Sequence, residues 1–600
     1  MGVPPMKHGQ DARATRAGKC FCRSARIPCA LAALVCTVLT AQAFDLVRDG
    51  QVRAVAVVGE NPAPTTLTAA GELTNYVYQI TGARMRISAA PVEGLNSVML
   101  GVDYKAARTD EICIRFRDKT TLELTGDMPR GTLYAVYELL EHFGCRFWAP
   151  GNETVPQTGT LTVPPECARV YAPPFVWRQA YGQSTSSDYK FAVKNRLNGT
   201  YWGHPRMPDE WGGKVQVDVG ETLTLRWVKS KVFFKDHPEW YTWSEKENKR
   251  IPAQLCTSNP EALAQLDKEV LEYLREHPDT KTLSISGNDS DKYCRCEECK
   301  KVIEKEKANS ALLMIAANRI GRLVARDYPD LRIVMLAYWA SEKPPLTMTF
   351  EPNVTVCFAK LRDFATPIAR NQHYMDNMLG WKKLSPNPLY IWDYNARFSN
   401  FILPSPAADT IGPNMRVYRD HGIAGMVAQL PWGSLADWVD LRCWLWGRTA
   451  WDPDVDSDRL IDEWIAGACG KGGPMMKSYW DLLLSLRKSI GPYGCGTEKW
   501  LTPQAILECH DLQQRAIAAT AEGEPRTHAQ VEKLSAAMLC AMVYRYKDLQ
   551  AYAEAEKVEI PARDAIIDRL EELGKKYRCS TYREWDDYRN MIKKMRAGEI

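Results

Sequence analysis

Short apolar runs alternate with longer segments of helical spacing over residues 175–455, and this alternation constrains the fold most. The expected strands lie at 175–181, 282–286, 332–338, 354–358, 389–392 and 425–429. Helical spacing separates several of them, at 260–276, 310–328 and 413–421. Two further strands are expected within 195–245. Such an alternation predicts a (β/α)8-like TIM barrel or a doubly wound sheet, and polar and aromatic residues just after the strand ends favour the barrel.

Different patterns flank the barrel, and 600 residues are too many for one core. Residues 44–168 are expected to form a small α/β domain. Its expected elements are strands at 52–58 and 97–101, helices at 66–81 and 133–143, and a hairpin over 113–125. Proline pairs at 164–165 and 173–174 mark a linker before the barrel domain, 175–455. Residues 456–600 are predicted to be helical to the end, because apolar residues recur at spacings of three and four.

The first 43 residues have the pattern of a secretory signal peptide. A positively charged stretch precedes the apolar run 30–41, and Ala41-Gln42-Ala43 resembles a cleavage site. This leader holds six of the 77 basic and one of the 73 acidic residues, so the net charge falls from +4 to −1 without it. We therefore expect a secreted or periplasmic protein without a membrane span after signal removal and without a nucleic-acid partner.

The run 282–286 leads into Asn288 and Asp289, which places an amide and a carboxyl group at the expected catalytic rim. A carboxyl group there can protonate a glycosidic oxygen, and the amide can orient a hydroxyl or acetamido group. We therefore expect Asp289 to be the catalytic acid and Asn288 to bind substrate. A helix cap or a turn is the structural alternative for Asp289.

A second carboxyl group follows another expected strand, where Asp393 lies between Trp392 and Tyr394. We expect Asp393 to act as a base or to orient water. The alternative is an ion pair with Arg397 or another basic residue. Aromatic planes suit sugar faces because they combine a large apolar area with a polar edge. The other expected substrate-binding residues are Arg178, Tyr181, Trp202, His204, Tyr338, Trp339, Tyr394, Gln429 and Trp432, with core packing as the alternative.

Four cysteines are expected to form a structural staple. Cys294, Cys296 and Cys299 form a C-x-C-x-x-C motif, and Cys256 supplies a fourth thiol. Four thiolates arranged tetrahedrally are the ligands of structural zinc sites. Disulfides are the alternative in an exported chain, and free buried thiols are a third. Either staple would stiffen the loop that carries Asp289, and no catalytic cofactor is expected.

Motifs of other mechanisms are missing from the sequence. It contains no G-x-S-x-G, P-loop, H-E-x-x-H or G-x-G-x-x-G motif. Nine histidines in the chain do not indicate a histidine-rich catalytic metal site.

Several motifs are informative together. They are Gln254-Leu255-Cys256, Asn288-Asp289 with the cysteine motif, Ile391-Trp392-Asp393-Tyr394, Gly422-Ile423-x-Gly425 and Trp451-Asp452-Pro453-Asp454. Over roughly residues 175–490 the chain resembles the bacterial domain-of-unknown-function family 4838, some members of which are classed as glycoside hydrolase family 163. Arg130-Gly131-x-x-Tyr134-Ala135 is similar to the N-terminal domain of α-glucuronidases and β-hexosaminidases.

The resemblance implies a barrel hydrolase that acts on an oligosaccharide or polysaccharide. Characterised relatives cleave N-acetylglucosamine linkages in complex N-glycans, and Asn288 and Asp289 would lie at the fourth strand. Relatives commonly present a Glu after Gly425-Met426-Val427, where this chain has Ala428 and then Gln429. Because Gln429 cannot act as a base or nucleophile, a substrate acetamido group would replace the missing carboxylate. The alternative is a catalytically impaired carbohydrate-binding protein on the same scaffold.

Overall fold

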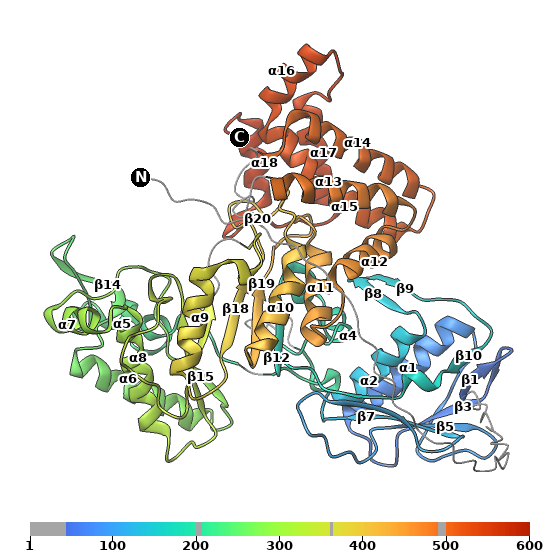
Figure 1. Cartoon of the computed structure of the whole chain (residues 1–600), viewed down its shortest axis with the longest axis horizontal. Coiled ribbons are helices and arrows are strands. Elements are labelled where there is room, and N and C mark those ends of the chain that lie inside the picture. Colours follow the sequence, from blue (N-terminus) through green and yellow to red (C-terminus); the bar gives the residue numbers. More distant parts are fainter. Residues whose placement is uncertain (1–43, 200–206, 216, 360–363, 490–499) are drawn as a thin grey trace, which may run out of the picture. The chain divides into compact units, whose positions relative to one another are not determined.

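A six-stranded parallel sheet carries the candidate site (Figure 1). The computed structural model describes residues 44–199, 207–215, 217–359, 364–489 and 500–600. The strands, in the order in which they pair, are Trp177–Tyr181 (β12), Gly425–Gln429 (β19), Tyr390–Tyr394 (β18), Val354–Ala359 (β17), Arg332–Ala337 (β16) and Thr282–Ser284 (β15). All six expected strands are confirmed. The result is a mixed α/β fold with a curled parallel half-barrel sheet, which is compatible with a TIM-like barrel.

Extended residues without regular strand pairing line both edges of this sheet. At the β12 edge, the backbone N–H of Asn198 donates to the carbonyl of Arg178 at 3.0 Å, and Val215 donates to the carbonyl of Asn198 at 2.7 Å. At the β15 edge, the backbone N–H of Thr222 donates to the carbonyl of Ser286 at 3.2 Å. These residues lie in the interval where the sequence predicted two more strands.

The prediction of two barrel strands within 195–245 is wrong for the described part of that interval. It contains one strand, Tyr241–Ser244 (β13), which pairs antiparallel with Lys249–Leu255 (β14) outside the parallel sheet. The extended residues are irregular because side chains take up some of the hydrogen bonds of a regular ladder, such as the donation from Ser284 N–H to a carboxylate oxygen of Asp218 at 2.9 Å.

Side chains alternate between the two faces of each parallel strand. On the inner face, Trp177, Val334, Cys357, Trp392 and Val427 form one buried cluster. The intervening residues join the larger core with the helices packed outside. These helices are Pro260–Glu276 (α6), Ser310–Val324 (α8), Gln372–Leu384 (α9), Ile411–Asp420 (α10) and Val439–Trp451 (α11). Shorter helices are Gln183–Ser187 (α3), Tyr189–Lys194 (α4), Ser230–Phe233 (α5) and Glu297–Glu306 (α7).

The N-terminal residues form an α/β region with the elements that the sequence predicts. One sheet pairs Leu161–Val163 (β10), Phe44–Arg48 (β1) and Gln51–Val52 (β2). A second has the order Arg169–Tyr171 (β11), Ile112–Phe116 (β6), Thr121–Gly126 (β7), Asn96–Leu100 (β5), Ala54–Val57 (β3) and Ile87–Ser88 (β4). The helices are Pro64–Thr81 (α1) and Gly131–His142 (α2), and Arg146–Ala149 (β8) pairs with Asn152–Thr154 (β9). The expected hairpin is the antiparallel pair β6–β7.

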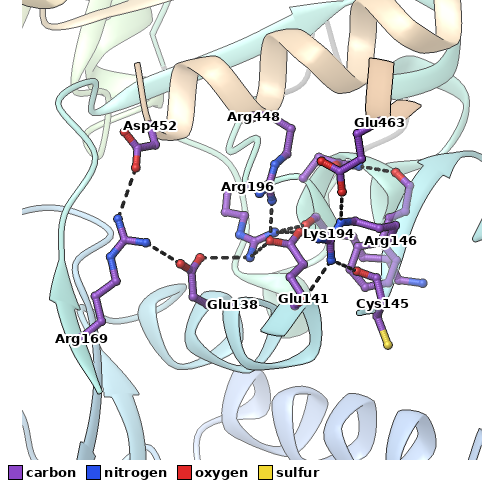
Figure 2. Close-up of polar contacts among 12 residues, drawn as sticks. Glu138, Glu141, Cys145, Arg146, Arg169, Lys194, Arg196, Arg448, Asp452 and Glu463 are labelled. Atoms are coloured by element: carbon purple, nitrogen blue, oxygen red, sulfur yellow. Dashed lines mark hydrogen bonds and ion pairs between the residues drawn. The ribbon is translucent and has the colours of Figure 1, made fainter. Parts of the chain in front are cut away.

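Helix α2 is joined to distant parts of the chain by buried ion pairs (Figure 2). Glu141 accepts hydrogen bonds from Arg196 at 2.5 and 3.0 Å and another from Arg448 of α11. Glu138 accepts from Arg169 at 2.6 Å and from Arg196 at 3.2 Å. Burial by itself would raise the pKa of Glu141, but Arg196 and Arg448 outweigh it and hold this pKa below its usual range.

A second buried ion pair joins the hairpin region to the first strand of the parallel sheet. Asp110 accepts from Arg178 of β12 at 2.7 Å and from Arg130 at 2.6 Å. The side-chain amide of Asn198 donates to the same carboxylate at 2.7 Å. Burial opposes ionisation of Asp110, but the two guanidinium groups outweigh it and hold its pKa below the usual range.

The C-terminal residues are mostly helical. The helices are Ser457–Cys469 (α12), Gly473–Ser489 (α13), Pro503–Thr520 (α14), Pro525–Tyr544 (α15), Tyr546–Glu556 (α16), Arg563–Lys576 (α17) and Tyr588–Arg596 (α18). A short antiparallel hairpin, Thr581–Arg583 (β20) with Asp586–Asp587 (β21), interrupts them, so the prediction of helix to the end is wrong there. Among the described residues, no helix has the length and apolar character needed to cross a membrane.

We predict that Asp110→Asn lowers the free energy of unfolding by about 3–5 kcal/mol, because it leaves the fully buried Arg178 without its carboxylate. Urea denaturation followed by tryptophan fluorescence measures the loss. Asp103→Asn, on the exposed surface of the same region, is the matched control. A loss below 1 kcal/mol in the Asp110 variant would contradict the importance of this pair.

Candidate active site at the carboxyl ends of the parallel strands

Six polar side chains lie at the carboxyl ends of the parallel strands and are called the rim cluster. They are Glu221, Asp289, Tyr338, Tyr394, Gln429 and Glu584. Asp289 follows β15 by five residues and is exposed. Tyr338, directly after β16, lies beside Asp289 and beside Tyr394 at the end of β18. Burial, followed by the nearby charge of Asp289, raises the pKa of Tyr338 to about 12.

Strand register explains why residues far apart in sequence meet here. Tyr181, Gln429 and Tyr394 are the last residues of adjacent strands β12, β19 and β18, and they pair with one another in register. Trp392, two residues before Tyr394, donates its indole N–H to the amide oxygen of Gln429 at 3.1 Å. The inner faces of three strands therefore present one row of polar and aromatic groups at the rim.

Glu221 is a member of the rim cluster that the sequence did not reveal. Its segment is held beside β15, because the Ser284 hydroxyl donates to the carbonyl of Gly220 at 2.9 Å and the Thr222 hydroxyl donates to the carbonyl of Ser284 at 2.9 Å. Burial raises the pKa of Glu221, and the negative charge of Asp289 raises it further. No motif surrounds Glu221, so only the fold brings it to the rim.

Glu584 is the second residue missed, and it comes from the C-terminal hairpin β20–β21. The side-chain amide of Gln429 donates to its carboxylate at 3.3 Å. Burial raises the pKa of Glu584 against the effect of this hydrogen bond, and the charges of Asp289 and Glu221 add to the increase. The charge of Asp289 thus reaches both glutamates, and the charge of Glu221 reaches Glu584, so the three carboxyl groups lie close together.

Aromatic side chains surround these carboxyl groups. The rings of Tyr181 and Trp432 meet edge to face with centroids 4.9 Å apart, and those of Tyr338 and Tyr394 are 6.5 Å apart. Trp339 has a left-handed backbone with φ 50°, and Trp585, next to Glu584, has φ 62°. Such a backbone is rare for bulky residues and is concentrated at functional sites.

Asn288 is hydrogen-bonded inside the protein and supports the loop that carries Asp289. Its amide nitrogen donates to the carbonyl of Ala253 at 2.7 Å and to the hydroxyl of Thr224. Its backbone N–H donates to the side-chain oxygen of Gln254 at 2.8 Å. Because its amide hydrogens are used inside the protein, Asn288 is placed as a residue that positions Asp289, and the expectation of a substrate-facing amide is corrected.

Asp393 does not join the rim cluster, which corrects its expected role as a base. It pairs in register with Ala428 of β19, one residue before the row of Tyr394 and Gln429, so it faces the opposite side of the sheet. There it is 1% exposed and lies close to Tyr418 of helix α10. The two expected acidic residues, Asp289 and Asp393, therefore do not face each other.

Two further positions face the helices for the same reason. Arg178 is fully buried in its ion pair with Asp110, which corrects its expected place in a sugar subsite. Ala428 is fully buried in the core shared with the helices. A glutamate at position 428 would thus point to the helix side of the sheet, away from Asp289.

Trp202, His204 and the expected leader, residues 1–43, lie outside the described residues.

The four expected metal-binding cysteines do come together. The sulfur atoms of Cys256, Cys294, Cys296 and Cys299 all lie within 4.8 Å of one another. The group lies at the end of β14 and the start of α7, shortly after Asp289 in the chain.

The family model described as "Domain of unknown function (DUF4838)" matches residues 147–481. No protein with curated annotation matches the chain significantly. Among solved structures, a family GH115 4-O-methyl-alpha-glucuronidase with specificity for decorated arabinogalactans has a TM-score of 0.60 and 13% identity, over 89% of this chain and 77% of its own. This likeness supports a shared fold.

Two other solved structures are more distantly similar. A GH138 enzyme targeting pectin rhamnogalacturonan II has a TM-score of 0.39 and 12% identity, over 91% of this chain and 98% of its own. A mutant Streptomyces plicatus β-hexosaminidase has a TM-score of 0.35 and 12% identity, over 81% and 94%.

We predict that Glu221→Gln stabilises the protein at pH 7 by about 0.5–2 kcal/mol, the range of common stabilising substitutions. A carboxyl group whose pKa is raised by folding loses stability as the pH rises from its unfolded pKa through its folded pKa. The gain should therefore vanish near pH 4, where both states are protonated. Thermal unfolding at both pH values measures it, with exposed Glu210→Gln as the control. Equal stability of the Glu221 variant and wild type at pH 7 would contradict the prediction.

Proposed function

We propose that this chain, which belongs to the DUF4838 family, is a secreted glycoside hydrolase that cleaves complex glycans containing N-acetylglucosamine. The observation that carries the proposal is the rim cluster, where three interacting carboxyl groups lie among aromatic side chains at the carboxyl ends of parallel strands. Active sites of barrel enzymes are built at this end of the strands. Glycosidic bonds are usually cleaved by a pair of carboxyl groups, one protonated and one ionised.

Glu221 is the better candidate for the acid. Burial and the neighbouring Asp289 charge raise its pKa, which favours the protonated state that an acid needs near neutral pH. In the reaction, Glu221 gives its proton to the glycosidic oxygen as the bond from that oxygen to the anomeric carbon breaks. This assignment replaces the role that the sequence predicted for Asp289.

Asp289 then supplies the second carboxyl group. It is exposed, and it lies close enough to Tyr338 for its charge to raise the pKa of that hydroxyl. As a carboxylate, it is suited either to remove a proton from the attacking water or to bond the anomeric carbon directly. Where the substrate carries an acetamido group, the oxygen of that group can attack instead, with Asp289 orienting it.

Glu584, Gln429 and the surrounding rings are suited to substrate binding. The amide of Gln429 donates to one carboxylate oxygen of Glu584, which leaves the second oxygen of Glu584 and the second amide N–H of Gln429 for sugar hydroxyls. Tyr181 and Trp432 add aromatic surface beside them. The described residues thus provide both hydrogen-bonding and stacking groups for a glycan.

The position of Ala428 favours a catalytic protein over one that only binds carbohydrate. The alternative of a catalytically impaired carbohydrate-binding protein was motivated by a missing Glu at this position. Since position 428 is on the helix side of β19, the alanine there does not remove a carboxyl group from the rim cluster. The cluster keeps three carboxyl groups of its own.

We predict that Glu221→Gln and Asp289→Asn each lower kcat/KM by about 100- to 10,000-fold, the usual contribution of a catalytic acid or base. The assay uses aryl N-acetylglucosaminides, aryl glucuronides and complex N-glycans, with products identified by mass spectrometry. Asp291→Asn, an exposed aspartate two residues from Asp289, is the matched control and should retain activity. Binding of glycans without any released product in wild type would favour the carbohydrate-binding alternative.

The pH dependence separates the two roles. Because the acid must be protonated, activity should fall on the alkaline side, at a pH above the usual range of a glutamate. We expect residual activity of Glu221→Gln to lose this alkaline limb. A profile in which that limb is unchanged would remove Glu221 from the acid role.

We predict that Trp585→Ala raises KM about tenfold, or about 1.4 kcal/mol, with kcat nearly unchanged. Trp585 is 97% exposed and adjoins Glu584, so its ring is available to stack on a sugar. Steady-state kinetics on oligosaccharides of increasing length measure the change. Trp585→Phe, which keeps an aromatic plane, should restore most of the affinity, and an unchanged KM in the alanine variant would exclude Trp585 from substrate binding.

A further inference from the structure

We propose that Cys256, Cys294, Cys296 and Cys299 bind one structural zinc ion that fixes the loop carrying Asp289. The four sulfur atoms come from two segments that are 38 residues apart, yet all lie within 4.8 Å of one another. Cys256, Cys294 and Cys299 are buried, and Cys296 is half-buried. A closed set of four thiolates without an open position is the ligand set of structural zinc.

The spacing of the sulfur atoms fits one shared ion. Sγ of Cys256 lies 3.7 Å from that of Cys296 and 3.9 Å from that of Cys299. Zinc–sulfur bonds of about 2.3 Å in a tetrahedron separate the sulfur atoms by about 3.8 Å. A disulfide brings one pair to about 2.05 Å and leaves the others apart. The almost equal approach of Cys256 to two partners therefore favours zinc.

The surroundings of the cysteines stabilise negative sulfur. The backbone N–H of Trp243 donates to Sγ of Cys294 at 3.3 Å, and the guanidinium group of Arg250 donates to the same sulfur at 3.8 Å. The hydroxyl of Ser258 lies 3.0 Å from Sγ of Cys299. Zinc with four thiolates carries a charge of about −2, and N–H donors and a nearby arginine offset that charge.

The N-terminus of helix α7 also favours negatively charged sulfur. Cys296 is the residue that caps this helix, and Cys299 lies in its first turn. The N-terminus of a helix carries partial positive charge, which favours a thiolate there. Groups of the β13–β14 hairpin and of the loop after it thus contact the sulfur atoms of Cys294 and Cys299, and the start of helix α7 carries Cys296 and Cys299.

Hydrogen bonds connect the cysteine site to the loop that carries Asp289. Gln254, two residues before Cys256, accepts from the backbone N–H of Asn288 at 2.8 Å and donates to the carbonyls of Asn288 and Ser290 at 2.9 and 3.1 Å. Cys294 follows Asp289 by five residues on the other side of the loop. The cysteine site therefore holds both strand β14 and the end of the loop, with Asp289 between them.

Metal content and thiol state of the full chain, purified without metal-affinity steps, test the proposal. We expect one zinc per chain by mass spectrometry of the metal, and four thiols that react only after a chelator is added. A mass lower by about 2 Da per bridge before reduction, without zinc, would show disulfides and overturn the proposal. Four freely reactive thiols without zinc would overturn it as well.

Variants locate the ion. Cys296→Ser and Cys256→Ser should each reduce bound zinc at least tenfold, whereas Cys509→Ser, a buried cysteine of helix α14, should retain one zinc per chain. Because a cysteine variant can fail to fold, the wild type is also stripped with a chelator. Its melting temperature should fall and should recover on addition of zinc but not magnesium.

These readouts are independent of hydrolysis. A zinc-free protein that cleaves glycans would overturn the metal site and leave the proposed function standing. A zinc-containing protein without activity on any glycan would overturn the proposed function and leave the metal site standing.

Discussion

The alternation of side chains along parallel strands is the constraint on which the candidate site depends. Tyr181, Gln429 and Tyr394 end three adjacent strands in one register and share the inner face. Their immediate neighbours, among them Asp393 and Ala428, face the helices instead. A single residue therefore separates a group that can meet a substrate from one that is sealed in the core.

This constraint also defines how far the sequence predicts the protein. All six parallel strands follow from short apolar runs, and most helices follow from apolar residues at spacings of three and four. The placement of Asp289 after β15 follows from the same pattern. The sequence does not predict which face of the sheet a strand residue points to, because an apolar run that is buried on both faces shows no alternation. For this reason the expected substrate-facing positions of Asp393 and Arg178 are wrong.

Glu221 and Glu584 escaped prediction for different physical reasons. Glu221 belongs to extended residues that form no regular strand, because side chains such as those of Asp218 and Thr222 share in their hydrogen bonds. Glu584 lies in a two-stranded hairpin among helices, too short to alter the helical periodicity around it. Both reach the rim only through contacts between distant segments, as Arg178 and Asp110 join the N-terminal region to the first parallel strand. Such contacts depend on tertiary packing that local periodicity does not encode.

The origin of Glu584 has a consequence for where this protein can be divided. The family match ends at residue 481, about a hundred residues before the hairpin that delivers this carboxylate. A chain that ends at residue 481 would keep all six strands of the parallel sheet and lose Glu584 from the rim cluster. The residues that the family model matches and the residues that form the rim cluster therefore have different ends.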